Sequence, residues 1–221
     1  MDVIEMSGKT YEGRPIKGVR INPGNSKKKI FVDSGIHARE WIAPSTVAYL
    51  INQLATNRSL NEDIINAFDW YLFPVLNPDG YEYTFSKDRL WRKNRNPEIS
   101  RTCPGIDLNR NWDYHWGEDV RGKDPCTELY AGPSPFSEPE TQAIRDFLAN
   151  LNADGSLALI VSFHSYVQVL MSPWSHTYAF PDDYSDLLAV MHATDLDFVT
   201  SIRTCSTDDG DVSGDLDLED E

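Results

Sequence analysis

The sequence predicts an α/β fold in which helices sandwich a mixed, largely parallel and twisted sheet. Three observations support this prediction. Segments with strand character alternate with segments of helical character along the chain. Residues 157–163 form an apolar run typical of a strand buried on both faces. The chain has 221 residues, of which 40% are hydrophobic, and this is enough for one domain with a proper core.

The first half of the chain is expected to supply three strands and two helices. The strands are short alternating or apolar runs, expected at residues 15–22, 28–35 and 70–76. Turn residues close the first and the third of these strands, at residues 23–25 and 77–80. The helices are expected at residues 41–55 and 60–67.

The second half begins with a long irregular segment, residues 88–135. A loop of this length inside a domain is either functional or wrongly assigned. A helix follows from Ser137 to about residue 150, because Glu140 completes a capping box with Ser137. After the strand at residues 157–163, a last helix is expected from Pro181 to about residue 203. We therefore assign residues 1–203 to one domain without repeats and residues 204–221 to a disordered tail.

Charge excludes some partners. The net charge of −15 argues against nucleic acid, because phosphate would be repelled. Eight acidic residues and no basic residue lie between Asp208 and Glu221, in a stretch with few apolar residues. This stretch resembles a calcium loop, but position 12 is Asp220 and no helix follows, so we favour a solvated acidic tail. No apolar run reaches the length of a membrane span, and the first ten residues lack a signal-peptide pattern.

Two histidines and one glutamate form the most informative pattern. His37 and Glu40 are three residues apart, and His164 follows 124 residues after Glu40. Two imidazoles and one carboxylate are the ligands of a catalytic zinc site that keeps a position open for water. Both histidines follow predicted strands, and sites in α/β sheets form at the carboxyl ends of strands. Without further support, the simpler readings are favoured, with His37 as a surface loop histidine and His164 as a hydrogen-bonded core histidine.

Three cysteines allow one disulfide and leave one thiol over. Cys103 and Cys126 bracket a loop rich in Trp, Gly and Asn. A disulfide between them fits a secreted protein, whereas three reduced thiols fit a cytosolic one. Spacing alone does not choose between these alternatives.

Motifs around the histidines resemble those of the zinc carboxypeptidases of the pancreatic A/B type. The resemblance covers residues 11–193, and together the motifs are highly specific. They follow the family's order: Tyr11-Glu12-Gly13-Arg14-Pro15-Ile16, Gly35-Ile36-His37-Ala38-Arg39-Glu40-Trp41-Ile42, Asn77-Pro78-Asp79-Gly80-Tyr81, Arg89-Leu90-Trp91-Arg92-Lys93-Asn94-Arg95, Gly105-Ile106-Asp107-Leu108-Asn109-Arg110-Asn111-Trp112 and Ser162-Phe163-His164-Ser165-Tyr166.

The resemblance implies a role for each matching residue. One zinc ion per chain would be bound by His37, Glu40 and His164, and Asp107 would orient His37. Arg92 would stabilise the oxyanion that forms when the scissile carbonyl is attacked. The remaining residues would contact substrate: Asn109 and Arg110 at the terminal carboxylate, and Arg39, Ser165 and Tyr166 in neighbouring subsites. The resemblance also implies a disulfide between Cys103 and Cys126.

The resemblance predicts a zinc-dependent enzyme that releases single C-terminal residues from peptides. Its expected partners are peptide or protein C-termini, and we expect a secreted monomer. The family's general-base glutamate, in a segment resembling Phe-Thr-x-Glu, is not encoded, and we do not assign that role to Glu219. We therefore read the chain as a C-terminally truncated domain of low activity. The alternatives are a non-catalytic fragment that binds zinc and peptide C-termini, and a fragment that does not fold.

Overall fold

The computed structural model describes residues 1–21, 28–98, 100–167 and 169–193. These residues belong to two compact units, of which the first is Met1–Tyr166 and the second begins at Val167. The first unit contains every predicted site residue. The second contains helix α5, Tyr184–Ala193, which begins three residues after the predicted start. The acidic tail, the thiol of Cys205 and the end of the last predicted helix lie outside the described residues.

A five-stranded mixed sheet forms the centre of the first unit, which confirms the predicted fold class. Its strands are β1 (Asp2–Glu5), β2 (Lys17–Ile21), β3 (Lys29–Ser34), β4 (Asp69–Phe73) and β5 (Leu157–Phe163), in the order β1-β2-β4-β3-β5. Strand β3 pairs in parallel with both β4 and β5, whereas β1 and β2 add antiparallel pairs at the other side. Strand β1 was not predicted from the sequence, because it is short and most of its residues are exposed.

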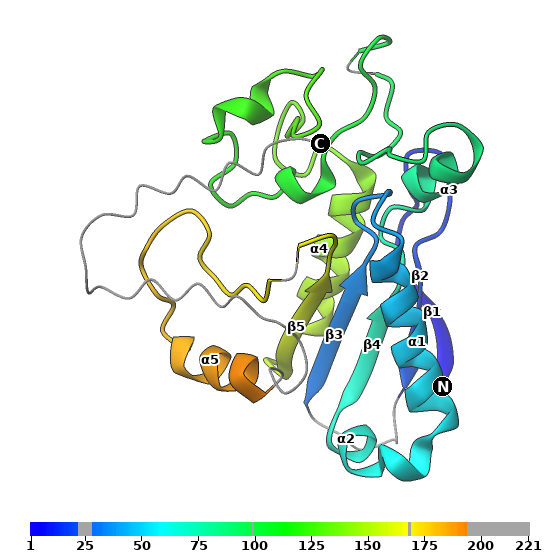
Figure 1. The fold of residues 1–221 in the computed structure, drawn as a ribbon, viewed down its shortest axis with the longest axis vertical. Helices are drawn as coiled ribbons and strands as arrows, with labels where there is room; N and C mark the ends of the chain where they lie inside the picture. The colour runs from blue at the N-terminus through cyan, green and yellow to red at the C-terminus, as the bar shows by residue number, and fades with distance from the viewer. Residues whose placement is uncertain (22–27, 99, 168, 194–221) are drawn as a thin grey trace. The chain divides into compact units, whose positions relative to one another are not determined.

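Parallel pairing brings the ends of β3 and β5 together. Asp33 lies opposite Ser162, and Ser34 lies opposite Phe163. The segments that follow these two strands, which carry the predicted zinc ligands, therefore leave the sheet side by side. In Figure 1 the arrowheads of β3, β4 and β5 point to the same end, and the irregular segment drawn in green lies beyond it.

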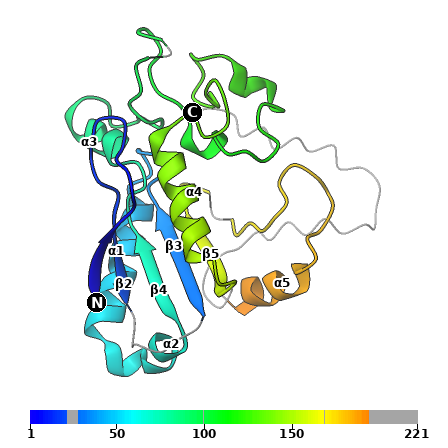
Figure 2. The same ribbon diagram turned by 180° about the vertical axis from the view of Figure 1, so that it is seen from behind.

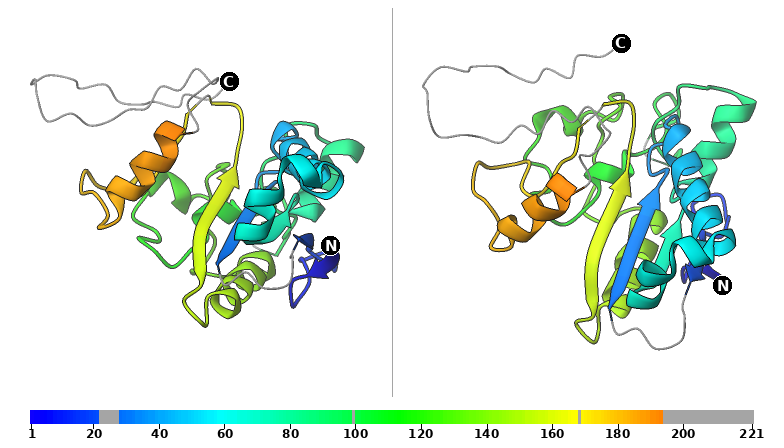
Figure 3. Two further views of the ribbon diagram at one scale, coloured as in Figure 1. Left: turned by 90° about the horizontal axis from the view of Figure 1, so that it is seen from below. Right: turned by 60° about the horizontal axis from the view of Figure 1, so that its bottom comes forward.

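Helices cover both faces of the sheet. Their bounds are Ile42–Thr56 for α1, Glu62–Ala67 for α2, Pro78–Ser86 for α3 and Pro139–Leu151 for α4; single 3₁₀ turns span Arg58–Leu60, Leu108–Arg110 and Val120–Lys123. Helix α4 packs on one face, and α1 and α2 pack on the other (Figures 1 to 3). None of the helices in the described ranges combines the length and the apolar character of a membrane span.

The side chains of β3 alternate between the two faces of the sheet, and each face has its own core cluster. Ile30 and Val32 pack toward α1 and α2, whereas Phe31 packs toward α4. On that side the rings of Phe31, Phe73 and Phe147 lie 5.0–6.1 Å apart, the spacing at which aromatic rings attract one another. The apolar side chains of β3 therefore fix the strand that leads to the candidate site.

Two sequence predictions about helix starts require correction. Residues 77–80 do not simply turn: Asn77 caps α3 by accepting a hydrogen bond from the backbone N–H of Gly80, and Pro78 occupies the first turn. The capping box of Ser137 and Glu140 is wrong, because α4 begins at Pro139 after Glu138. The buried Glu140 carboxylate instead accepts hydrogen bonds from the N–H of Tyr11 and from Asn94.

The prediction that residues 157–163 are buried on both faces is also wrong. Exposed and partly buried residues alternate along β5, and Ile160 is 50% exposed. Within the described part of the chain β5 pairs only with β3, so it lies at the edge of the sheet. The apolar run correctly predicted a strand, but it did not predict that this strand lies at the edge of the sheet.

Candidate metal centre

The loop after β3 folds His37 and Glu40 onto the same side. Gly35 adopts a positive φ of 65°, and a side chain there would lie only 3.0–3.1 Å from the backbone of residues 74 and 75. The chain then closes a tight turn, in which the N–H of Glu40 donates to the carbonyl of His37. His164 follows the last residue of β5, Phe163. Because β3 and β5 are neighbours, the three side chains meet at the end of the sheet.

The distances between these side chains fit a shared metal ion. His37 Nδ1 lies 2.7 Å from Glu40 Oε1 and 3.2 Å from His164 Nδ1, and His164 Nδ1 lies 3.0 Å from Glu40 Oε2. Zinc bonds of about 2.0–2.1 Å at the tetrahedral angle would separate ligand atoms by about 3.3 Å. A bound cation would be held by the lone pairs of one nitrogen from each imidazole and by the Glu40 carboxylate, which lie at this spacing.

Electrostatics also favour a cation at this point. Burial alone would raise the pKa of Glu40, but hydrogen bonds with His164 and His37 and their charges lower it to about 2. Glu40 is therefore ionised at neutral pH. His37 and Glu40 are buried, whereas His164 is exposed, so the group is open on one side. An open side is what a catalytic metal site needs for water or substrate.

Asp107 lies behind His37, as the resemblance implies. Its Oδ1 is 3.2 Å from His37 Nε2 and accepts a hydrogen bond from the N–H of Asn109 at 2.9 Å. Its Oδ2 accepts two hydrogen bonds from Arg92, from Nε at 3.1 Å and from Nη2 at 2.9 Å. Burial alone would raise the pKa of Asp107, but the hydrogen bond with His37 and the nearby positive charges hold it below its usual range.

Arg92, Asn109 and Arg110 lie next to this network. The Nη1 atom of Arg92 is 4.0 Å from Glu40 Oε1, so one edge of its guanidinium faces the metal group. Asn109 and Arg110 sit on the 3₁₀ turn that begins after Asp107, and the Nη1 of Arg110 donates to the carbonyl of Asn109. A single turn of chain thus joins the carboxylate behind His37 to the two residues predicted to bind a terminal carboxylate.

The three other predicted substrate residues differ in their surroundings. The N–H of Ser165 lies 3.3 Å from Oε2 of Glu40, one of the three predicted metal ligands. Tyr166 is 81% exposed. Arg39 is paired with Glu128, with 2.9 Å between Nη2 and Oε2. The structure therefore brings Ser165 to the predicted ligand Glu40, whereas Arg39 forms an ion pair that was not predicted from the sequence.

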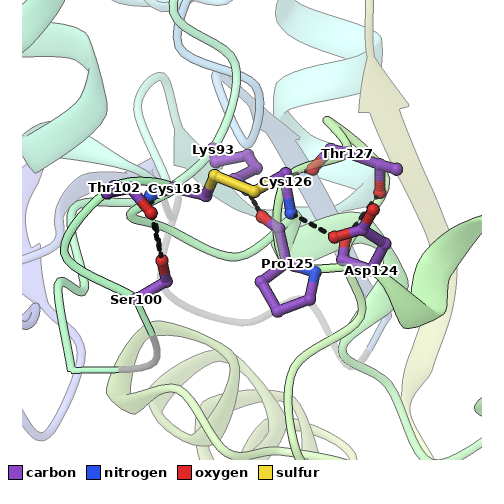
Figure 4. The surroundings of a disulfide bond; sticks show 8 residues. All are labelled: Lys93, Ser100, Thr102, Cys103, Asp124, Pro125, Cys126 and Thr127. Atoms are coloured by element: carbon purple, nitrogen blue, oxygen red, sulfur yellow. Dashed lines mark hydrogen bonds between the residues drawn. A yellow bond between two sulfur atoms is a disulfide. The ribbon is translucent and has the colours of Figure 1, made fainter.

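The predicted disulfide is present between Cys103 and Cys126. Figure 4 shows that Lys93 lies beside it and reaches the carbonyls on either side of Cys126. The Nζ atom of Lys93 donates to the carbonyl of Pro125 at 2.8 Å and to that of Thr127 at 3.0 Å. Burial lowers the pKa of this buried lysine.

Two supporting residues lie in the matched motifs but were missed, namely Lys93 and Asn111. Asn111 is fully buried and uses both ends of its amide. It donates to the carbonyls of Ala131 and Ser134, and it accepts from Thr141 Oγ1 at 2.7 Å. This side chain ties the turn carrying Asn109 and Arg110 to the start of α4. Only their place inside a specific motif could have singled these residues out, because their partners are distant in sequence.

Comparisons with known proteins agree with this geometry. The zinc carboxypeptidase family profile matches residues 1–218. A carboxypeptidase B of Astacus astacus is 43% identical over 213 residues, covering 91% of this chain and 70% of its own length. A zinc carboxypeptidase of Simulium vittatum is 45% identical over 186 residues, covering 84% and 60%.

Solved structures give the same result. The structure of thrombin activatable fibrinolysis inhibitor has a TM-score of 0.80 and 33% identity, covering 86% of this chain and 49% of its own. The carboxypeptidase A of Helicoverpa armigera has a TM-score of 0.77 and 34% identity, covering 87% and 48%. The chain thus spans about half to 70% of the length of these relatives. On the family match and these identities, the chain belongs to the zinc carboxypeptidase family.

Proposed function

We propose that the protein releases single C-terminal residues from peptides in a zinc-dependent hydrolysis. The observation that carries this proposal is the convergence of His37, Glu40 and His164 at the end of the sheet, with Arg92 facing the same group. Zinc held by these three residues would polarise the scissile carbonyl and lower the pKa of a bound water.

The surrounding residues have separate tasks in this proposal. Asp107 accepts a hydrogen bond from the N–H at His37 Nε2, and this tautomer would leave the lone pair of Nδ1 free to bind zinc. Arg92 stays anchored on Asp107 through Nε and Nη2, and its Nη1 donates to the oxygen on which negative charge develops. Arg110 and Asn109 bind the free carboxylate of the peptide, and this contact makes the enzyme an exopeptidase.

The compartment, the oligomeric state and the domain boundaries of the protein are further parts of this proposal. We infer that the protein is a secreted monomer, and the Cys103–Cys126 disulfide supports an oxidising compartment. We further propose that residues 1–203 form one catalytic domain and that residues 204–221 are an acidic tail.

A second candidate is a protein that binds zinc and peptide C-termini without catalysis. In the described residues, the metal-ligating group has Glu40 as its one carboxylate, and two histidines complete it. A positioned general base contributes roughly 10²–10⁴-fold to such a reaction. In the described residues this group holds no second carboxylate that could act as a general base. We therefore expect binding by this 221-residue chain to be far easier to measure than turnover.

The test compares a labelled peptide carrying a free C-terminal carboxylate with the same peptide amidated, by fluorescence anisotropy and by mass spectrometry of products. The zinc-loaded chain should bind the acid roughly tenfold or more tightly, because a charge-assisted bidentate contact is lost in the amide. Arg110→Ala should abolish this preference, and Arg58→Ala, at an exposed arginine in the turn after α1, should preserve it. Equal binding of acid and amide would contradict the proposal, and released terminal residues would exclude the non-catalytic candidate.

A further inference from the structure

Arg39 and Glu128 form an ion pair between the metal-ligand loop and the disulfide loop. Arg39 Nη1 donates to Glu128 Oε1 at 3.1 Å, and Nη2 lies 2.9 Å from Oε2. The same Nη1 also lies 3.4 Å from the carbonyl of Leu90. A guanidinium that binds both oxygens of a carboxylate is fixed in orientation as well as in position.

The backbone that carries Glu128 is anchored on both sides. Two residues before it, Cys126 is bonded to Cys103, and the carbonyl of Thr127 accepts the hydrogen bond from Lys93 Nζ (Figure 4). Two residues after it, the carbonyl of Tyr130 accepts a hydrogen bond from the N–H of Asp107 at 2.9 Å. Glu128 therefore presents its carboxylate from a fixed backbone that is linked to the residue behind His37.

Arg39 is equally well fixed. It stands between the proposed ligands His37 and Glu40, and its carbonyl accepts hydrogen bonds from the Nη1 of Arg89 at 2.8 Å and from the N–H of Trp41. The pair remains accessible, since the side chains of Arg39 and Glu128 are 32% and 50% exposed. Both charged groups are therefore accessible to a ligand beside the loop that carries His37 and Glu40.

We propose that Glu128 determines which side-chain charges the site accepts on the amino side of the scissile bond. This inference rests on the proposed function, because it assumes that a peptide C-terminus lies in the site. An unpaired Arg39 would attract acidic side chains. Glu128 neutralises that charge, and its oxygens can accept further hydrogen bonds from a lysine or arginine of the peptide. Peptides with basic residues before the terminal one are the favoured class, and peptides with acidic residues there are disfavoured.

The experiment measures binding of fluorescent peptides to the zinc-loaded 221-residue chain. The peptides share one terminal residue and carry lysine, glutamine or glutamate at the two preceding positions, each as the free acid and as the amide. Glu128→Gln keeps the size of the side chain and removes its charge. Glu118→Gln is the matched control, because Glu118 is an exposed glutamate that pairs with His115 and its substitution changes the net charge equally.

The unmodified chain should bind the lysine peptide more tightly than the glutamate peptide. Glu128→Gln should reduce this preference about threefold to fivefold, in line with a partly exposed charge contact. Glu118→Gln should leave it unchanged, and high salt should weaken it. An unchanged preference in Glu128→Gln, or an equal change in Glu118→Gln, would overturn the inference. If acid and amide forms bind alike, the proposed function fails; if acids are preferred but the charge preference is unaltered, only this inference fails.

Discussion

Replacing Asp107 by asparagine should weaken zinc binding and destabilise the fold at the same time. The carboxylate receives four donors: His37 Nε2 and the N–H of Asn109 at Oδ1, and two N–H groups of Arg92 at Oδ2. An asparagine of the same shape offers only one oxygen, so its NH₂ group must face donors on one side. Arg92 loses its counterion in either orientation of the amide, and either His37 or Arg92 also loses its hydrogen-bond acceptor.

The structure sets the size of both effects. Loss of a group that orients a metal-binding histidine typically costs 10–100-fold in metal affinity, so we expect the zinc Kd of Asp107→Asn to rise by roughly that factor. Asp107 is fully buried and the side chain of Arg92 is only 13% exposed. Breaking a buried ion pair by removing one partner costs about 3–5 kcal/mol, which is a large part of the stability of one domain.

Competition with a chromogenic chelator measures the zinc Kd, and chemical denaturation of the metal-free chain measures stability. Asp146→Asn serves as the control, because Asp146 pairs with Arg145 on the exposed side of α4 and its loss should change stability by less than about 0.5 kcal/mol. A zinc Kd within twofold of the unmodified value, despite the lost carboxylate, would refute the orienting role of Asp107.

Three further predictions concern stability. Burial raises the pKa of Glu140 to about 7, against 4.5 in an unfolded chain. The native state thus holds this proton more tightly. The unfolding free energy should therefore fall by up to about 3 kcal/mol between pH 4.5 and pH 7, and a denaturation series should show this slope flattened in Glu140→Gln. Cys103→Ser should destabilise the chain by about 3 kcal/mol, because it opens the loop closed by Cys126; equal midpoints with and without reductant in the unmodified chain would contradict this. Leu72→Ala, at a fully buried core position, should cost about 3–5 kcal/mol in urea denaturation, and a cost below 1 kcal/mol would mean that the core described for that face is wrong.

Local patterns were sufficient to predict the strands that carry the site. The apolar run Ile30-Phe31-Val32 alternates between two core layers, and residues 157–163 have the length and composition of a strand. Since parallel strands end at one edge, the convergence of His37 and His164 followed from their positions after these strands. Their ligand type then pointed to a metal centre, and the matched motifs added Asp107 and Arg92.

Contacts between distant segments could not be predicted in the same way. Glu140 looks like a capping residue in sequence, yet its carboxylate binds the N–H of Tyr11, 129 residues away. Lys93 looks like a surface lysine until the carbonyls around Cys126 are known. The pairing of Arg39 with Glu128 spans 89 residues and depends on the disulfide loop. In each case a tertiary partner decides the role of a polar residue, and local sequence carries no signal for it.

Zinc content of the purified protein tests the central claim most directly. The unmodified chain should contain about one zinc per molecule by mass spectrometry, bound through His37, Glu40 and His164. A double variant, His37→Ala with His164→Ala, should contain almost none. The matched control removes two exposed histidines elsewhere, His176→Ala with His192→Ala, and should retain the full equivalent. Equal zinc in the double variant and the unmodified chain would show that the metal lies elsewhere and would contradict the account.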